Sequence, residues 1–196
     1  MAMQARAERT REALIRAAAD VVDDNGYHGA TLVAISRCAR VSMGALTFHF
    51  ASKSELAEAL VERAARIAGE RAAGAVAGQV SPLRAVGELL QVLARLLDED
   101  VVVRAGSLLA RERPDIVPPW HSSWTPTLCR LLKEAEAAGE LRRGARPSAV
   151  AGLVMYLLTA VEVQPRTDPG QEFRGAAGAM SRLWPFVCHG IAAVPA

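Results

Sequence analysis

The sequence lacks a run of apolar residues long enough to cross a bilayer. Its longest such run, residues 149–161, is shorter than the roughly 20 residues that a membrane-spanning helix needs, and a buried helix explains it better. The first 16 residues contain four arginines but neither an apolar core nor a small-residue cleavage site. We therefore expect no secretory signal, no membrane contact and a cytoplasmic protein.

Cysteine and the motifs typical of enzymes are also scarce. Cys38, Cys129 and Cys188 are odd in number and far apart, which argues against a disulfide framework and favours a packing role. The histidines form no pair at metal-ligand spacing with them, and no glycine-rich phosphate loop or hydrolase motif occurs. An enzyme would depend on isolated residues such as Glu112 and His121. We expect no metal, no cofactor and no enzymatic activity.

Neither sign of charge is in large excess. A formal net charge of +2 over 196 residues does not reveal a nucleic-acid partner, and this length favours one compact unit or two small ones. The distribution is more informative, because four arginines before residue 17 precede an acidic cluster at residues 20–24. Cations near a helix N-terminus oppose the macrodipole. A bound phosphate would resolve that conflict; a set of ordinary solvated arginines is the alternative.

Hydrophobic periodicity predicts helices throughout the chain, and hence an all-α fold. The segment from about residue 7 to residue 24 is amphipathic and is closed by Asn25 and Gly26. Thr31, Ser42 and Ser52 then stand where three further helices would begin, and each can serve as an N-cap. Two short helices joined by a tight turn and braced by a longer helix on each side form a helix-turn-helix unit.

The second short helix, residues 42–49, has an inner and an outer face. Leu46 and Phe50 can pack inward, and Gly44 lets the backbone come close to another surface. The side chains expected to face outward are those of Met43, Ala45, Thr47 and His49.

After residue 72 the composition shifts to glycine, serine and proline, which indicates a joint between a head and a body. We predict a DNA-binding helix-turn-helix head at residues 1–55, a connecting helix at about 52–75 and a helical dimerisation body at residues 76–196. The body should contain a central buried helix from Leu83. Further helices are expected over residues 101–113, from about Ser122, from Pro147, and in a last segment that includes Phe173 and a kink at Pro185.

The last two helices are apolar over much of their circumference, and Gly175 and Gly178 permit close approach. A four-helix interface between two copies would cover these faces, so we expect a homodimer through the last two long helices. A dimer also suits a helix-turn-helix that reads two half-sites about one turn of DNA apart. A monomer with a large core is the alternative.

The head contains a longer pattern between Thr31 and Leu56. It comprises TL at residues 31–32, VS at 41–42, GAL at 44–46, FHF at 48–50 and SK at 52–53, and it resembles the helix-turn-helix head of TetR-family transcriptional repressors. GALTFHF with SKSEL, RAG at residues 104–106 and a tryptophan after a proline-rich loop are similar to γ-butyrolactone autoregulator receptors of antibiotic-producing actinomycetes. The resemblance implies a ligand-responsive repressor in the regulation of antibiotic biosynthesis.

The resemblance also implies which residues contact operator DNA. Thr47 stands where the family usually has tyrosine, and Met43 stands where close relatives often have lysine. Each replacement removes a usual backbone contact, so we expect weaker or differently tuned binding unless arginines before residue 12 compensate. We also expect shape readout to contribute. The candidate DNA-binding residues are Arg6, Arg9, Thr31, Val33, Ser42, Met43, Gly44, Ala45, Thr47, His49 and Lys53.

For the body, the resemblance implies an effector pocket enclosed by the central helices. Trp124 matches the pocket tryptophan of the receptors, and Pro118-Pro119 would be a hinge that couples pocket filling to the head. Few charged groups lie among the apolar side chains of the body helices. This favours a small, neutral, lipophilic effector with Thr127, Thr159 or Gln164 as a polar partner. Core packing of the tryptophans is the alternative. The candidate ligand-binding residues are Leu89, Leu93, Leu108, Leu109, Trp120, Trp124, Thr127, Leu128, Met155 and Thr159.

The expected mechanism is a population shift. The effector would favour a body conformation in which the two heads no longer fit both half-sites of a palindromic operator, and DNA would be released. Two other hypotheses remain open from the sequence: a ligand-binding or partner-interaction protein whose head has weakened, and a repressor that responds to no ligand.

Overall fold

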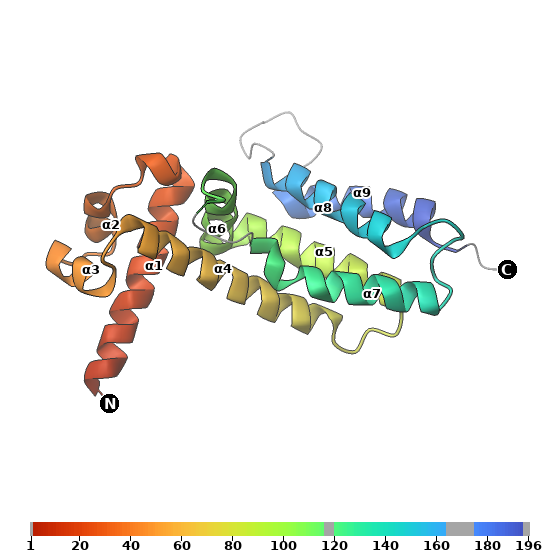
Figure 1. Cartoon of the computed structure of the whole chain (residues 1–196), viewed down its shortest axis with the longest axis horizontal. Coiled ribbons are helices and arrows are strands. Elements are labelled where there is room, and N and C mark those ends of the chain that lie inside the picture. The colour runs from red at the N-terminus through yellow and green to blue at the C-terminus, as the bar shows by residue number, and fades with distance from the viewer. Residues whose placement is uncertain (1, 116–119, 164–174, 194–196) are drawn as a thin grey trace. The chain divides into compact units, whose positions relative to one another are not determined.

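The structure is a computed structural model that describes residues 2–115, 120–163 and 175–193 (Figure 1). Among these residues the only β-pairing is an isolated antiparallel bridge between Leu141 and Ala192, so the expected all-α fold is confirmed. The predictions made for Pro118, Pro119, Gln164 and Phe173 lie outside the described residues. The helices are α1 (Ala2–Gly29), α2 (Leu32–Cys38), α3 (Met43–His49), α4 (Lys53–Val76), α5 (Pro82–Glu99), α6 (Val101–Glu112), the 3₁₀ helix η1 (Trp120–Ser123), α7 (Thr125–Ala137), α8 (Pro147–Val163) and α9 (Gly175–Ile191).

The chain divides into two compact units. The first comprises Met1–Ile67 and Asp100–Ser122, and the second comprises Ala68–Glu99 and Ser123–Ala196. Helix α6 therefore belongs to the same unit as the helix-turn-helix, although α5 separates the two in the sequence. The expected boundary between head and body at residue 76 stays a prediction.

The first unit is organised around α1. Buried side chains of α1, including Leu14 and Ile15, form one core with residues of α2, α3, α6 and the first turns of α4. The helix begins at Ala2, earlier than the sequence indicated. Its expected end at Gly26 is confirmed as a break, because Gly26 has φ 67° and ψ 176° and the helical assignment resumes beyond it to Gly29. Glycine tolerates this positive φ, where other residues are strained.

All three predicted N-caps are confirmed. The hydroxyl oxygens of Thr31, Ser42 and Ser52 each accept a hydrogen bond at 3.1 Å from the backbone N–H three residues further along the chain. The Glu55 carboxylate also accepts from the backbone N–H of Ala51 at 2.7 Å, which fixes the start of α4 from both directions. Local capping chemistry thus sets where α2, α3 and α4 begin.

The second unit is built on α5, as the sequence predicted. Its leucines, from Leu83 to Leu97, are buried, whereas Val92 is half-buried, and α7, α8 and α9 pack against this helix. The carboxylate of Asp98 accepts hydrogen bonds from the backbone N–H groups of Ala176 and Ala177, at 2.8 and 2.9 Å. The end of α5 therefore caps the start of α9.

The helix expected from about Ser122 begins later. Residues 120–123 form a 3₁₀ turn, Trp124 occupies the N-cap position, and α7 starts at Thr125. Pro126 explains the difference, because proline is tolerated in the first turn of a helix but lacks the N–H that an interior position would donate. Trp124 is fully buried at this junction and Trp120 nearly so.

The longest apolar run lies in α8, which begins at Pro147 as predicted. Its buried residues include Val150 and Val154, and the helix belongs to the packed second unit. Within the part of the chain that the structure describes, no helix is long and apolar enough to cross a membrane.

Candidate DNA-binding site

A tight turn sets the geometry of the helix-turn-helix. Between α2 and α3, Arg40 adopts a positive φ of 54°, and the backbone N–H of Val41 donates to the carbonyl of Ser36 at 3.0 Å. Leu46 and Phe50 are buried at 0% and 1% exposure, as expected, and they attach α3 to the core of the first unit. The opposite face of α3 is consequently available to another molecule.

The most exposed large side chain of α3 is Phe48, at 82% exposure. Sequence reasoning did not select it as a site residue. The signal was present, because at about 100° per residue position 48 lies opposite the mean direction of the inward Leu46 and Phe50. Met43 is also exposed at 39%, and Val33 on the neighbouring α2 at 47%. The site therefore has a more apolar outer face than the sequence alone suggested.

The charge of this region has one sign. No aspartate or glutamate occurs between Asp24 and Glu55, whereas Arg37, Arg40 and Lys53 do. Both arginines are exposed and Lys53 is half-exposed. A near-neutral chain thus has a helix-turn-helix whose charged side chains are all basic, which suits a polyanion.

A groove runs between the start of α1 and α3. Among the predicted residues, Arg6 contributes from α1, and Ser42, Ala45 and His49 contribute from the α3 side. Arg9 is exposed elsewhere on α1. The complete lining is Arg6, Ala7, Thr10, Val41, Ser42, Ala45, Phe48 and His49.

Thr47 does not offer its hydroxyl hydrogen to solvent. The hydroxyl donates to the backbone carbonyls of Met43 and Gly44, at 3.0 and 3.2 Å. A phosphate oxygen only accepts hydrogen bonds, so a contact from Thr47 to phosphate would first have to break this bond. As it stands, the side chain offers a partner its methyl group and the accepting lone pairs of its oxygen.

Lys53 lies beside the aromatic ring of Tyr27. Its ammonium nitrogen is 4.2 Å from the ring centroid, within the range of a cation–π interaction. The guanidinium of Arg113 lies 4.6 Å from the same centroid, and the Tyr27 hydroxyl is 3.3 Å from that of Ser54. The ring orients the only lysine of the head at the start of α4.

Three contacts fix α6 to the helices of the head. The backbone N–H of Tyr27 donates to the Glu112 carboxylate at 2.7 Å, directly after the break at Gly26. Arg104 forms an ion pair with Asp23 of α1 at 3.0 Å. A Cβ atom at Gly106 would lie 2.4 Å from the Cβ of Ala64, so only glycine allows α6 to approach α4 this closely. Figure 1 shows α6 beside α1 and α4 in this unit.

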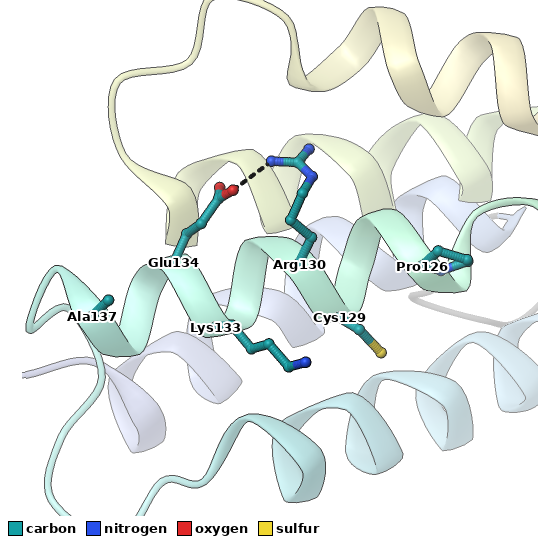
Figure 2. Close-up of a pocket in the computed structure, with 6 residues that line it drawn as sticks. All are labelled: Pro126, Cys129, Arg130, Lys133, Glu134 and Ala137. Atoms are coloured by element: carbon teal, nitrogen blue, oxygen red, sulfur yellow. Dashed lines mark hydrogen bonds and ion pairs between the residues drawn. The ribbon is translucent and has the colours of Figure 1, made fainter.

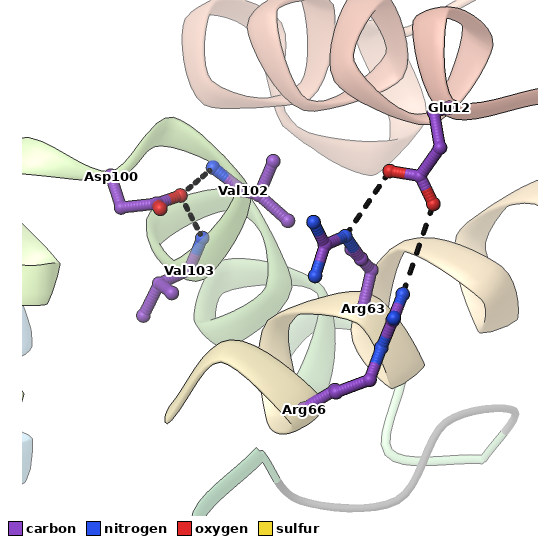
Figure 3. A network of polar contacts seen from close by, with 6 residues as sticks. All are labelled: Glu12, Arg63, Arg66, Asp100, Val102 and Val103. Carbon is purple, nitrogen blue, oxygen red and sulfur yellow. Dashed lines mark hydrogen bonds and ion pairs between the residues drawn. The ribbon is translucent and has the colours of Figure 1, made fainter. Parts of the chain in front are cut away.

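Ion pairs also tie α1 to α4. Figure 3 shows Glu12 reaching both Arg63, at 3.2 Å, and Arg66, at 3.8 Å. The same view shows Asp100 at the start of α6, where its carboxylate accepts from the backbone N–H groups of residues 102 and 103. At the other end of α6, the neighbouring Arg113 guanidinium lowers the pKa of the Asp115 carboxyl.

The candidate effector residues are divided between the two units. Leu108, Leu109 and Trp120 belong to the first unit and the others to the second. Thr159 is exposed, and its hydroxyl donates to the backbone carbonyl of Met155 at 3.0 Å. Leu108, Thr127 and Met155 are half-buried, while Leu89, Leu93, Leu109, Trp120, Trp124 and Leu128 are buried.

A separate surface groove lies along α7 in the second unit. Figure 2 shows Arg130 and Glu134 paired on one side of the helix at 2.7 Å, with Cys129 and Lys133 pointing the other way. Three of its six lining residues, Arg130, Lys133 and Glu134, are charged, and it contains none of the candidate effector residues.

Comparison with known proteins supports the importance of the helix-turn-helix. The family described as "Bacterial regulatory proteins, tetR family" matches residues 14–60. The A-factor receptor protein of Streptomyces griseus is 32% identical over 194 residues, which cover 96% of this chain and 67% of that protein.

Solved structures extend the similarity to the whole fold. CprB of Streptomyces coelicolor A3(2), a TetR family protein, is 32% identical with a TM-score of 0.79, covering 96% of this chain and 91% of that one. A structure of CprB with its biological operator sequence has 33% identity and a TM-score of 0.76, covering 96% and 91%. A γ-butyrolactone receptor described as ArpA-like is 30% identical, with a TM-score of 0.77 and 96% and 90% coverage.

The fold and the head together define a helix-turn-helix DNA-binding regulator. The chain belongs to the TetR family of bacterial transcriptional regulators, which are not enzymes. Over nearly its whole length it is similar to the A-factor and γ-butyrolactone receptors of that family.

Proposed function

We propose that this protein is a transcriptional repressor that binds palindromic operator DNA as a homodimer and is released by a small lipophilic effector of the γ-butyrolactone type. The observation that carries the proposal is the head: α3 is fixed by Leu46 and Phe50 and presents an exposed face in a stretch with basic but no acidic side chains. That arrangement suits the major groove and its flanking phosphates.

Operator binding is supported by a relative and by the capping geometry. CprB, which shares the fold over 96% of this chain, is known in complex with its biological operator sequence. Here Thr31 and Ser42 stand at the exposed starts of α2 and α3, and Lys53 stands at the start of α4. These residues would contact phosphates, while the other candidates on α2 and α3 would lie at the groove and its flanking backbone; they are Val33, Met43, Gly44, Ala45, Thr47 and His49.

The dimer would form through α8 and α9. Four large apolar side chains on these helices are exposed in the single chain, and two of them, Tyr156 and Phe186, are exposed at 79% and 80%. The others are Leu153 and Val163. An isologous four-helix contact would remove all four from water, and it would place two heads for two half-sites.

The effector would bind in the body. Relatives that cover nearly the whole chain are described as receptors for A-factor and γ-butyrolactone. Trp124 and the buried candidate leucines of the same unit, Leu89, Leu93 and Leu128, carry no charge, which suits a neutral ligand. Thr127 is the half-buried polar candidate for a hydrogen bond.

Release of DNA would act through α6. This helix belongs to the head's unit and is tied to it by the bond between Glu112 and the Tyr27 amide and by the pair between Arg104 and Asp23. A ligand that shifts α6 would therefore also shift Tyr27, which follows the break in α1, and with it Lys53 at the start of α4. An effector can weaken DNA binding only by as much as its affinities for the DNA-binding conformation and for the released conformation differ.

The test is selection of bound duplexes from a random library by the purified protein at two salt concentrations. The proposal expects an enriched palindrome with half-sites about one turn apart, bound more weakly at higher salt. γ-Butyrolactones of different acyl length are then titrated into the complex, and at least one should dissociate it.

Failure of the two steps would mean different things. Absence of any enriched sequence would contradict the repressor and favour a ligand-binding or partner-interaction protein with a weakened head, in line with the engaged hydroxyl of Thr47. An operator that no butyrolactone releases would retain the DNA-binding regulator and reject the effector class.

A further inference from the structure

The recognition helix α3 lacks the side chains that usually read three of the four bases. Guanine is read mainly by arginine or lysine, adenine by asparagine or glutamine, and cytosine by aspartate or glutamate. The sequence of α3 is MGALTFH, which contains none of these six residue types. The usual charged and amide partners of guanine, adenine and cytosine are therefore absent from this helix, and only Thr47 and His49 have polar side-chain groups.

The exposed groups that α3 does present are apolar. Phe48 is 82% exposed, and Met43 adds its thioether at 39% exposure. Thr47 is also exposed, but its hydroxyl hydrogen is donated to the carbonyls of Met43 and Gly44, so its methyl and its accepting oxygen remain. The flanking residues Gly44 and Ala45 are small, so the Phe48 ring stands out from the helix surface.

The major groove contains one apolar group that such side chains recognise, the C5 methyl of thymine. We infer that Phe48 selects thymine at a defined position of each operator half-site by covering its methyl group. The inference rests on the proposed operator binding and specifies how that site reads sequence. It makes Phe48 a specificity-determining residue.

The surroundings of Phe48 favour DNA over a protein partner. The ring lines the groove between α1 and α3 together with Arg6, Ser42 and His49, and the stretch from residue 25 to residue 54 has no carboxylate. An apolar ring set among basic and hydroxyl groups fits a base edge between phosphates. Arg6 in this lining and the absence of carboxylates from residues 25–54 favour a polyanion over a protein partner.

The experiment replaces single thymines of the selected operator with 2′-deoxyuridine, which removes the methyl group and keeps the base pair. Affinities are measured by fluorescence anisotropy for the wild type and for Phe48→Ala. At one position of each half-site, wild type should lose about fourfold for one substitution and about 15-fold for both half-sites, the expected effect of one covered methyl group each. A cytosine change there should weaken binding, and 5-methylcytosine should recover part of the loss.

The variants separate methyl recognition from other effects of uracil on the duplex. In Phe48→Ala the thymine-to-deoxyuridine ratio should fall below about twofold, since the cycle isolates the pairwise contact. Phe48 is 82% exposed, so this variant should keep the wild-type melting temperature. Val80→Ala, at a 98% exposed position outside the helix-turn-helix, should keep the fourfold ratio.

Two outcomes overturn the inference in distinguishable ways. If an operator is selected but tolerates deoxyuridine at every position, or if Phe48→Ala keeps the wild-type ratio, thymine reading by Phe48 is wrong and the repressor stands. If no duplex is selected, the proposed function fails and the inference fails with it.

Discussion

Single residues decide how strongly this head holds the DNA backbone. Met43 and Thr47 replace a lysine and a tyrosine that the resemblance associates with backbone contacts, and Thr47 engages its hydroxyl within α3. Lys53 remains as the lysine of the head, oriented by the Tyr27 ring. The expected result is a head with fewer ionic contacts than its relatives and a correspondingly shallow salt dependence.

Met43→Lys tests this expectation. The position is exposed on α3, so the new ammonium should reach a phosphate and tighten operator binding at low salt. The slope of log K against log salt should steepen by about one for each protomer. Titrations at four salt concentrations measure it, with Val80→Lys adding the same charge outside the head. Equal slopes for Met43→Lys and wild type would show that this position faces no phosphate.

Ser42 tests the cap that starts α3. Its hydroxyl accepts from the Ala45 N–H at 3.1 Å, and Ser42→Ala removes the acceptor. We expect the free energy of unfolding to fall by about 1 kcal/mol in urea denaturation, and by only a few tenths in Ser42→Gly. An unchanged free energy of unfolding in Ser42→Ala would show that the cap contributes nothing.

Among the helices of the first unit, the packing depends mainly on the position of α6. Gly106 lets this helix approach Ala64 of α4, and Glu112 fixes the end of α6 to the break within α1. Both contacts are long-range and involve helices whose own ends are set locally. Packing between complete elements, more than their formation, connects α6 to the head.

Gly106→Ala should disturb this packing. Its Cβ would lie 2.4 Å from that of Ala64, and the overlap should lower the free energy of unfolding by about 1 to 3 kcal/mol. Adding Ala64→Gly should recover part of that loss, with a coupling energy of about 1 kcal/mol or more in denaturant titrations. Gly74→Ala, in open space on α4, is the control and should be neutral or stabilising. Additive effects of Gly106→Ala and Ala64→Gly would contradict the close approach.

The sequence predicted elements well where the signal was local. Thr31, Ser42 and Ser52 were recognisable as caps because a hydroxyl bonds the N–H groups of the turn that follows it. The prediction for the start of α7 was wrong, because Pro126 suits the first turn of a helix and the tryptophan spacing does not reflect this. The role of Asp98 at the start of α9 depends on residues about 80 positions away, which no local pattern contains.

The candidate site was predicted in part for the same reason. The identity of α3 follows from its periodicity and caps, and Phe48 was missed although its angular position was available. The bond that engages Thr47 and the ring that orients Lys53 depend on side-chain conformation and on the fold of the first unit. They could be found only from the three-dimensional structure.

In the whole molecule, the proposed operator binding requires two copies of the chain. Tyr156 is the most exposed large apolar side chain of α8, at 79% exposure. Tyr156→Glu would bury an unpaired charge in a dimer interface, which is costly, so we expect a monomer in sedimentation velocity with unchanged helical circular dichroism. Val80→Glu, at 98% exposure, should remain dimeric. A dimeric Tyr156→Glu would move the interface away from this face.

In the proposed function, one dimer holds both halves of a palindromic operator. The test compares the affinity of the purified protein for its selected duplex with its affinity for the same duplex in which one half-site is scrambled. We expect two protomers on the intact duplex and an affinity that is lower by up to about a thousandfold after scrambling, since half of the specific contacts are lost. Equal affinity for the two duplexes would contradict it.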